Sequence, residues 1–175
     1  MKSLSLAIVG VALALAGCAT TDLPWAGPKA VATLRPTQGN TVTGQVTFTQ
    51  SGSKTLVTGE VRGLAPGREH GFHVHEKGDC SAPDAMSAGG HFNPKSTQHG
   101  NYAMSPHHSG DMPNLKADAN GVARISWEDD ELTVKDGPAS VVGRALIVHR
   151  DPDDYKSQPA GNSGPRLACG VIAKG

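Results

Sequence analysis

Short runs in which apolar and polar side chains alternate are the main structural signal of this chain. Val42, Val46 and Phe48 alternate with threonine and glutamine between residues 41 and 49. A period of two residues is typical of a β-strand with one face in the core. Further strands are predicted in similar runs at residues 30–34, 55–61, 70–76, 122–127, 132–134, 145–149 and 167–173.

Turn sequences separate these runs, and no segment of any length has the apolar period of a helix. Asn120-Gly121, Asp136-Gly137 and Ala65-Pro66-Gly67 are typical of tight turns. The 22 glycines and the aromatic content of 4% also argue against a helical bundle. We therefore predict an all-β fold, an antiparallel sandwich or barrel built from one domain.

The N-terminal residues are set apart from this domain. Lys2 precedes an apolar stretch, Leu4–Leu15, that is shorter than the ~20 residues of a membrane-spanning helix. The sequence Leu15-Ala16-Gly17-Cys18 resembles the bacterial lipoprotein cleavage box. It implies a signal peptide at residues 1–17, a lipid on Cys18, a tether at 18–28 and a domain at 29–175. The alternative is an ordinary signal peptide whose cleavage region happens to contain a cysteine.

This reading predicts a protein of the cell envelope, lipid-anchored on the periplasmic side, and Ala19 favours the outer membrane over the inner. The 16 basic and 16 acidic residues create no global field, so no nucleic-acid partner and no membrane contact beyond the lipid are expected. With Cys18 lipidated, Cys80 and Cys169 most simply pair as a disulfide in an exported protein. The alternative is that one of these two thiols is a metal ligand.

Histidines carry the candidate chemistry. His73 and His75 are two residues apart on a predicted strand, so both side chains leave the same face while Phe72 and Val74 enter the core. Two solvent-facing histidines would have the same spacing. However, the long segment at 77–113 supplies four more candidate ligands, His91, His99, His108 and Asp111. A further candidate, His149, ends the predicted strand at 145–149. Neutral imidazole suits copper and zinc, so the pattern predicts two neighbouring metal ions.

At this point the chain resembles the copper-zinc superoxide dismutases, in their exported bacterial form. The matching segments are GFHVHEKGD (71–79), GHFNP (90–94), HG (99–100), HSGD (108–111), GRALIVH (143–149) and GPRLACGVI (164–172). The resemblance spans about residues 60–175. It implies a Greek-key sandwich or flattened barrel of about eight strands, with long metal-binding and closing loops.

The resemblance also implies the roles of individual residues, with one copper and one zinc ion per chain. The copper ligands would be His73, His75, His91 and His149, and the zinc ligands His91, His99, His108 and Asp111. His91 would bridge both ions and donate a proton during catalysis. Asp153 would link a copper histidine to a zinc histidine, Cys80 and Cys169 would form the family disulfide, and Arg166 would dock the substrate anion.

Two histidines are left outside the predicted site. His107 adjoins His108, and either ring would be a chemically sensible zinc ligand, but the family spacing to Asp111 selects His108. His70 matches a position where the family often has a structural histidine. The segment at 158–165 lacks the charged residues that guide substrate in eukaryotic relatives. Lys77, Lys95 and Arg150 are candidates for that task, with Lys95 favoured because it follows His91.

The implied activity is the dismutation of superoxide to dioxygen and hydrogen peroxide, which would protect the envelope. One alternative is a non-catalytic periplasmic lipoprotein that only binds copper and zinc. Another is a surface lipoprotein for adhesion with purely structural metals. A structural zinc site is closed and four-coordinate, so it would not need a second imidazole cluster. A homodimer is compatible with the family, but family membership does not fix how subunits pair.

Overall fold

A computed structural model describes residues 27–175 of the chain. The predicted signal peptide, Cys18 and most of the predicted tether lie outside the described residues. The strands are β1 (Lys29–Pro36), β2 (Thr43–Ser51), β3 (Lys54–Arg62), β4 (Glu69–His70), β5 (Phe72–His75), β6 (Leu115–Lys116), β7 (Ala123–Asp129), β8 (Ala145–His149) and β9 (Arg166–Lys174). One short 3-10 turn, η1, covers Met86–Ala88. Among residues 27–175, no helix is long and apolar enough to cross a membrane.

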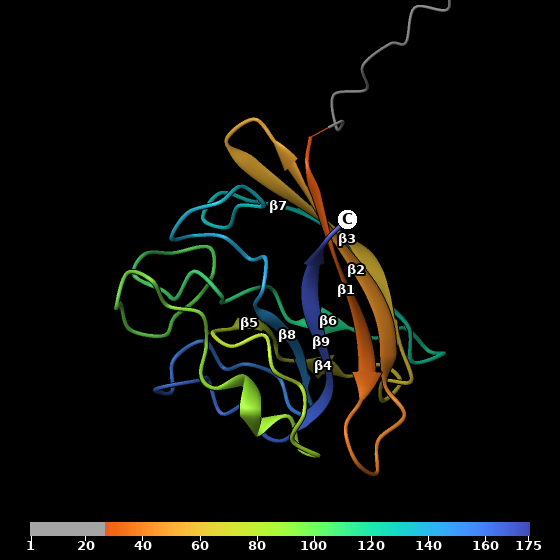
Figure 1. Cartoon of the computed structure of the whole chain (residues 1–175). Coiled ribbons are helices and arrows are strands. Elements are labelled where there is room, and N and C mark those ends of the chain that lie inside the picture. Colours follow the sequence, from red (N-terminus) through yellow and green to blue (C-terminus); the bar gives the residue numbers. More distant parts are fainter. Residues whose placement is uncertain (1–26) are drawn as a thin grey trace, which may run out of the picture.

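Seven strands form one curled antiparallel sheet in the order β5-β8-β9-β1-β2-β3-β7 (Figure 1). Several neighbours in this order are distant in sequence, so the chain crosses over instead of forming a simple meander. β5 and β7 are the two edge strands of this sheet. The chain enters β5 from β4 and β7 from β6, so the short pair β4–β6 connects the two edges. The predicted all-β antiparallel fold is confirmed.

The core follows the alternation of the sequence. In β1, Ala30, Ala32 and Leu34 are buried while the residues between them are more exposed. Phe72 and Val74 of β5 enter the same core, where Phe72 packs edge-on against Trp127 with ring centroids 6.1 Å apart. Burying each such side chain contributes about 1.5–3 kcal/mol. One face of β5 is thus fixed toward the core, and the other is left for the histidines.

One predicted strand, at residues 132–134, is wrong. This segment is irregular and has only an isolated bridge between Thr133 and Ser140. The Asp129 carboxylate accepts hydrogen bonds from the backbone N–H groups of residues 131 and 132, which turns the chain. The buried Gln50 side chain then accepts from the Thr133 hydroxyl and the Val134 N–H. Side chains therefore take the place of strand partners here.

Two smaller differences lie on either side of the long loop. The predicted strand at 70–76 divides at Gly71 into β4 and β5, and the two-residue β6 was not predicted. The long loop itself is confirmed, and the 3-10 turn η1 is its only helical segment between residues 77 and 113. A disulfide between Cys80 and Cys169 ties the start of this loop to β9, as predicted.

Candidate metal centre

His73 and His75 lie on the face of β5 opposite the core. Both were expected on the outside of the sheet, yet their exposed fractions are only 0% and 1%. The long loop covers them by pairing with β5, through bridges between His75 and His91 and between His73 and Asp111. Gly110 is needed at this contact, because a Cβ there would overlap the carbonyl oxygen of Val74. The β5 histidines are thus enclosed instead of solvated.

The structure brings seven candidate ligands into two adjoining groups that share His91. The ligand atoms within each group lie within 4.8 Å of one another, and all seven residues are buried. The first group, here called the four-histidine group, contains His73, His75, His91 and His149. The second, here called the aspartate group, contains His91, His99, His108 and Asp111.

Hydrogen bonds fix which ring nitrogens of the four-histidine group face its interior. Nδ1 of His75 donates to the carbonyl oxygen of Gly89 (2.9 Å), and Nδ1 of His149 donates to that of Gly164 (3.0 Å). A carbonyl only accepts, so each Nδ1 carries the proton and each Nε2 has a lone pair. These two Nε2 atoms lie 3.4 Å apart. Two facing lone pairs repel, and a cation between them would turn this repulsion into coordination.

The protonation of these buried rings agrees with that geometry. Burial lowers the pKa of His75 well below its ordinary value, and the neighbouring His91 and His149 lower it further. Burial also lowers the pKa of His149 well below its ordinary value, and the neighbouring His73 lowers it further. The rings are therefore neutral near pH 7, which is the form that binds metal ions.

His91 faces both groups. Its Nδ1 lies 2.8 Å from Oδ1 of Asp111, while its buried Nε2 has no hydrogen-bond partner within residues 27–175. Burial and the neighbouring His73 lower the pKa of His91 to about 4, despite the Asp111 carboxylate. One ring thus presents a nitrogen to each group, as a ligand shared by two cations would.

Asp111 organises the aspartate group. Its Oδ1 lies 3.0 Å from Nδ1 of His99 and 3.5 Å from Nδ1 of His108. Burial would raise the pKa of Asp111, but hydrogen bonds from His108, His91 and His99 outweigh it and hold the pKa far below its usual range. The group therefore offers three imidazoles and one ionised carboxylate, a donor set typical of zinc.

A second carboxylate, Asp153, touches both groups from behind. Its Oδ2 lies 2.8 Å from Nε2 of His73, and its Oδ1 lies 3.0 Å from Nε2 of His99. This leaves Nδ1 of His73 for the four-histidine group, and that atom is buried without a partner. Burial lowers the pKa of His99, but hydrogen bonds to Asp111 and Asp153 outweigh it and raise the pKa to about 9. Such carboxylates fix the orientation of metal-binding imidazoles.

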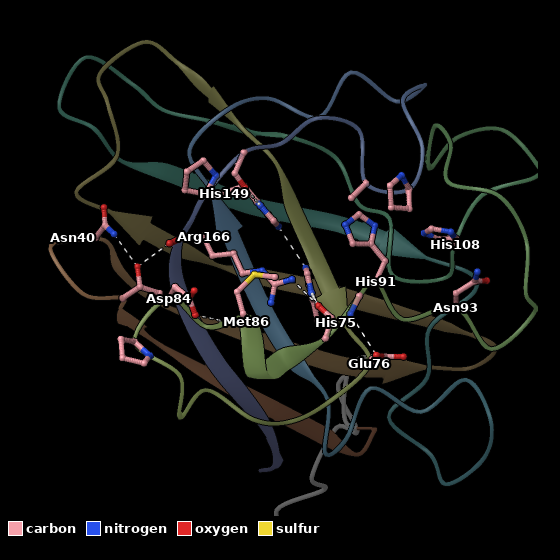
Figure 2. A pocket seen from close by; sticks show the side chains of 18 of the residues that line it. Asn40, His75, Glu76, Asp84, Met86, His91, Asn93, His108, His149 and Arg166 are labelled. Carbon is pink, nitrogen blue, oxygen red and sulfur yellow. Dashed lines mark hydrogen bonds between the residues drawn. The ribbon is translucent and has the colours of Figure 1, made fainter.

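A cleft of about 990 Å³ opens onto the four-histidine group (Figure 2). His75, His91, His149 and Arg166 are among its lining residues. The Arg166 guanidinium donates to the carbonyl oxygens of Ala85 and Gly89, each at 2.6 Å. Burial lowers the pKa of Arg166, but arginine stays charged at any relevant pH. The cleft therefore holds one fixed positive charge beside the histidines.

Comparison with known proteins agrees with this geometry. The family described as "Copper/zinc superoxide dismutase (SODC)" matches residues 42–172. The chain belongs to the copper/zinc superoxide dismutase family. "Superoxide dismutase [Cu-Zn] 2" of Aquifex aeolicus is 40% identical over 176 residues, covering 98% of this chain and 99% of the relative. "Superoxide dismutase [Cu-Zn]" of Onchocerca volvulus is 43% identical over 157 residues, covering 83% and 96%.

Two further relatives extend the comparison. "Extracellular superoxide dismutase [Cu-Zn]" of Brugia pahangi is 40% identical over 153 residues, covering 82% of this chain and 75% of the relative. The crystal structure of the clock protein EA4 is 43% identical, covers 83% of this chain and 93% of that one, and superposes with a TM-score of 0.76. The copper and zinc of the family name match the two donor groups, since imidazoles suit copper and the aspartate group suits zinc.

Within this copper/zinc superoxide dismutase fold, the structure separates the two adjacent histidines. His108 lies in the aspartate group, while Nδ1 of His107 donates to the carbonyl oxygen of His108 and its Nε2 lies 3.7 Å from Glu131. His70 is also outside both groups, and its buried Nδ1 donates to the carbonyl oxygen of His149. That contact supports the backbone of a candidate ligand.

Lys95, the residue favoured for steering the substrate, lies outside the cleft, and its steering role stays a prediction. The Lys95 ammonium pairs with Glu131 at 2.7 Å and does not line the cleft. Arg150 pairs with Asp151, also at 2.7 Å. Among the three candidates, only Lys77 lacks an ion-pair partner in the part of the chain that the structure describes. Within that part, Arg166 is the only lysine or arginine that lines the cleft.

Sequence reasoning missed two amides that hold the site. The Gln158 side chain hydrogen-bonds to both backbone polar groups of His99, accepting from its N–H at 3.0 Å and donating to its carbonyl oxygen at 2.8 Å. Asn114 does the same for the backbone of Asp153. Neither contact leaves a local sequence signal, because the partners are 59 and 39 residues apart.

Proposed function

We propose that this chain is a copper- and zinc-dependent superoxide dismutase. The family, the relatives' names and the two donor groups support this conclusion. The observation that carries it is the shared ring of His91, with Nδ1 at the aspartate group and an unpartnered Nε2 at the four-histidine group. The four-histidine group would hold copper and the aspartate group zinc.

When bound, copper supplies a one-electron redox couple and zinc a Lewis acid without redox chemistry. The reaction converts two superoxide anions and two protons to dioxygen and hydrogen peroxide. Arg166 is the residue that docks each anion, because its charge is fixed in the cleft and some of its N–H donors remain free. A metal store without catalysis would have no use for a guanidinium held there.

His91 is the protein group that delivers one of the protons. Its Nε2 is the one ring nitrogen of the shared ligand without a partner, and the ring lines the cleft. A proton held at Nε2 can pass to the reduced anion, and water supplies the other proton. The Asp111 contact at Nδ1 keeps the ring oriented during this exchange.

Metal content and activity of the purified mature protein test the proposal together. We expect one copper and one zinc per chain, and removal of superoxide that depends on the copper. His91→Ala should bind both metals more weakly and lose most of the activity, while His107→Ala, which changes a neighbouring ring outside the groups, should keep both properties. Binding of both metals without superoxide removal would refute the enzyme and favour a metal store.

We further propose the lipoprotein processing inferred above, with lipid on Cys18, a tether at 18–28, the domain at 29–175 and an outer-membrane location facing the periplasm. The disulfide and the name of the extracellular relative support an oxidising compartment outside the cytoplasm. Mass spectrometry of the mature N-terminus is the test. A lipid-modified Cys18 is expected, and an unmodified N-terminus elsewhere would contradict the proposal.

A further inference from the structure

The Asp153 carboxylate must be held accurately, because it contacts rings of both donor groups. The residue is 3% exposed and lies in the segment between β8 and β9. Its two oxygens lie 2.8 Å from His73 and 3.0 Å from His99. A side chain on an irregular segment has no sheet to fix it, so other contacts must do so.

Asn114 fixes the backbone of this aspartate. Its Oδ1 accepts from the N–H of Asp153 at 2.9 Å, and its Nδ2 donates to the carbonyl oxygen of Asp153 at 3.0 Å. One amide thus satisfies both backbone polar atoms of Asp153. The Cα position is fixed, but the carboxylate can still rotate.

Tyr155 completes the arrangement. Its backbone N–H donates to Oδ1 of Asp153 at 2.7 Å, and its hydroxyl accepts from the backbone N–H of Asn114 at 2.9 Å. Asp153, Tyr155 and Asn114 therefore form a closed ring of hydrogen bonds. The N–H of Tyr155 points at the carboxylate oxygen that His99 also contacts.

The backbone of Tyr155 indicates that this position is constrained. Its φ is +58°, in the left-handed region that bulky side chains rarely enter. Such a conformation persists only where the surroundings hold it. The hydroxyl bond to Asn114 and an edge contact with the ring of Tyr102, at 5.9 Å between centroids, are the contacts that do so.

We propose that Tyr155 is a positioning residue for the zinc-binding aspartate group. It acts through Asp153, whose carboxylate it holds against Nε2 of His99, so that Nδ1 of His99 faces the metal position. The inference rests on the proposed zinc site. Loss of the Tyr155 hydroxyl should let the Asn114 segment and Asp153 shift, and should loosen His99.

Zinc release from the metal-loaded protein to a chromogenic chelator tests this role. Tyr155→Phe keeps the ring and removes one hydrogen-bond acceptor, so release should be about three- to tenfold faster, the usual effect of one neutral hydrogen bond. Tyr102→Phe is the matched control, since it removes a hydroxyl from a side chain that is 41% exposed. This control should release zinc at the wild-type rate.

Cobalt(II) placed in the aspartate group distinguishes positioning from a general loss of stability. Its visible absorption bands should shift in Tyr155→Phe and stay unchanged in Tyr102→Phe. If the wild type binds zinc tightly and Tyr155→Phe keeps the wild-type zinc release rate and cobalt bands, this inference is overturned and the proposed zinc site is not. Failure of the wild type to bind zinc at all would overturn the proposed zinc site with it.

Discussion

Gly161 stands directly against the carboxylate that joins the two donor groups. Its φ is +62°, and a Cβ at this position would overlap Oδ1 of Asp153 and lie 2.8 Å from Nε2 of His99. Gly161→Ala therefore forces either Asp153 or the Gly161 segment to move. The substitution should disturb the aspartate group without changing any candidate ligand.

The expected magnitude has two parts. An alanine in the left-handed region costs about 1–2 kcal/mol. Loss of the charged hydrogen bond between Asp153 and His99 costs about 1.5–3 kcal/mol more. Gly161→Ala should thus lower the free energy of unfolding by roughly 2.5–5 kcal/mol. Gly52 is a matched control, because its φ is +60° and a Cβ there would meet no atom within 4 Å.

Urea unfolding of the metal-free protein and zinc competition with a chelator measure the two effects. Gly52→Ala should cost only about 1–2 kcal/mol and leave the zinc affinity unchanged. Gly161→Ala should cost more and weaken zinc binding by about tenfold or more, since 1.4 kcal/mol is a factor of ten. Equal losses of stability and equal zinc affinities for the two variants would refute the role assigned to Asp153.

Three further predictions follow from the site and the disulfide. Because the pKa of His99 is raised to about 9, its protonation stabilises the metal-free fold below about pH 6.5 and this contribution is lost as the pH rises through 9. Zinc binding at pH 7.5 should accordingly release the His99 proton, and calorimetry in buffers of different ionisation enthalpy should show the release fading above pH 9. Replacing Cys80 and Cys169 by serine should lower the free energy of unfolding by about 4–5 kcal/mol, as expected for a disulfide that closes a loop of 89 residues. Urea titrations measure this loss, and an unchanged unfolding midpoint would contradict it. Arg166→Met should reduce the rate constant for superoxide removal about tenfold, with less salt dependence, because a partly buried charge a few ångströms from an anion is worth about 1–3 kcal/mol. Unchanged salt dependence would count against docking by Arg166.

The sequence allowed the strands and the ligand-bearing face to be predicted because their signals are local. Alternation placed Phe72 and Val74 in the core, which necessarily put His73 and His75 on the other face. The family disulfide and the all-β class also followed from residue types and motifs. The same local logic did not reveal that the long loop would bury both histidines.

The strand prediction failed at residues 132–134, where side chains, one of them from a distant strand, bind the backbone. Gln50 and Asp129 capture the backbone at residues 131–134, so a run that reads as a strand is irregular. The ion pair between Lys95 and Glu131 also joins residues that are 36 positions apart in the sequence. Similarly, Asn114 and the Tyr155 hydroxyl act across 39 and 41 residues, a distance over which one sequence carries no pairing signal.

Anomalous diffraction from crystals of the metal-loaded protein, measured at the copper and zinc absorption edges, tests the shared role of His91 most directly. The account predicts one copper peak beside Nε2 of His91, among His73, His75 and His149, and one zinc peak beside Nδ1, among His99, His108 and Asp111. Peaks that leave the His91 ring unbound on either side, or a single ion serving both groups, would contradict it.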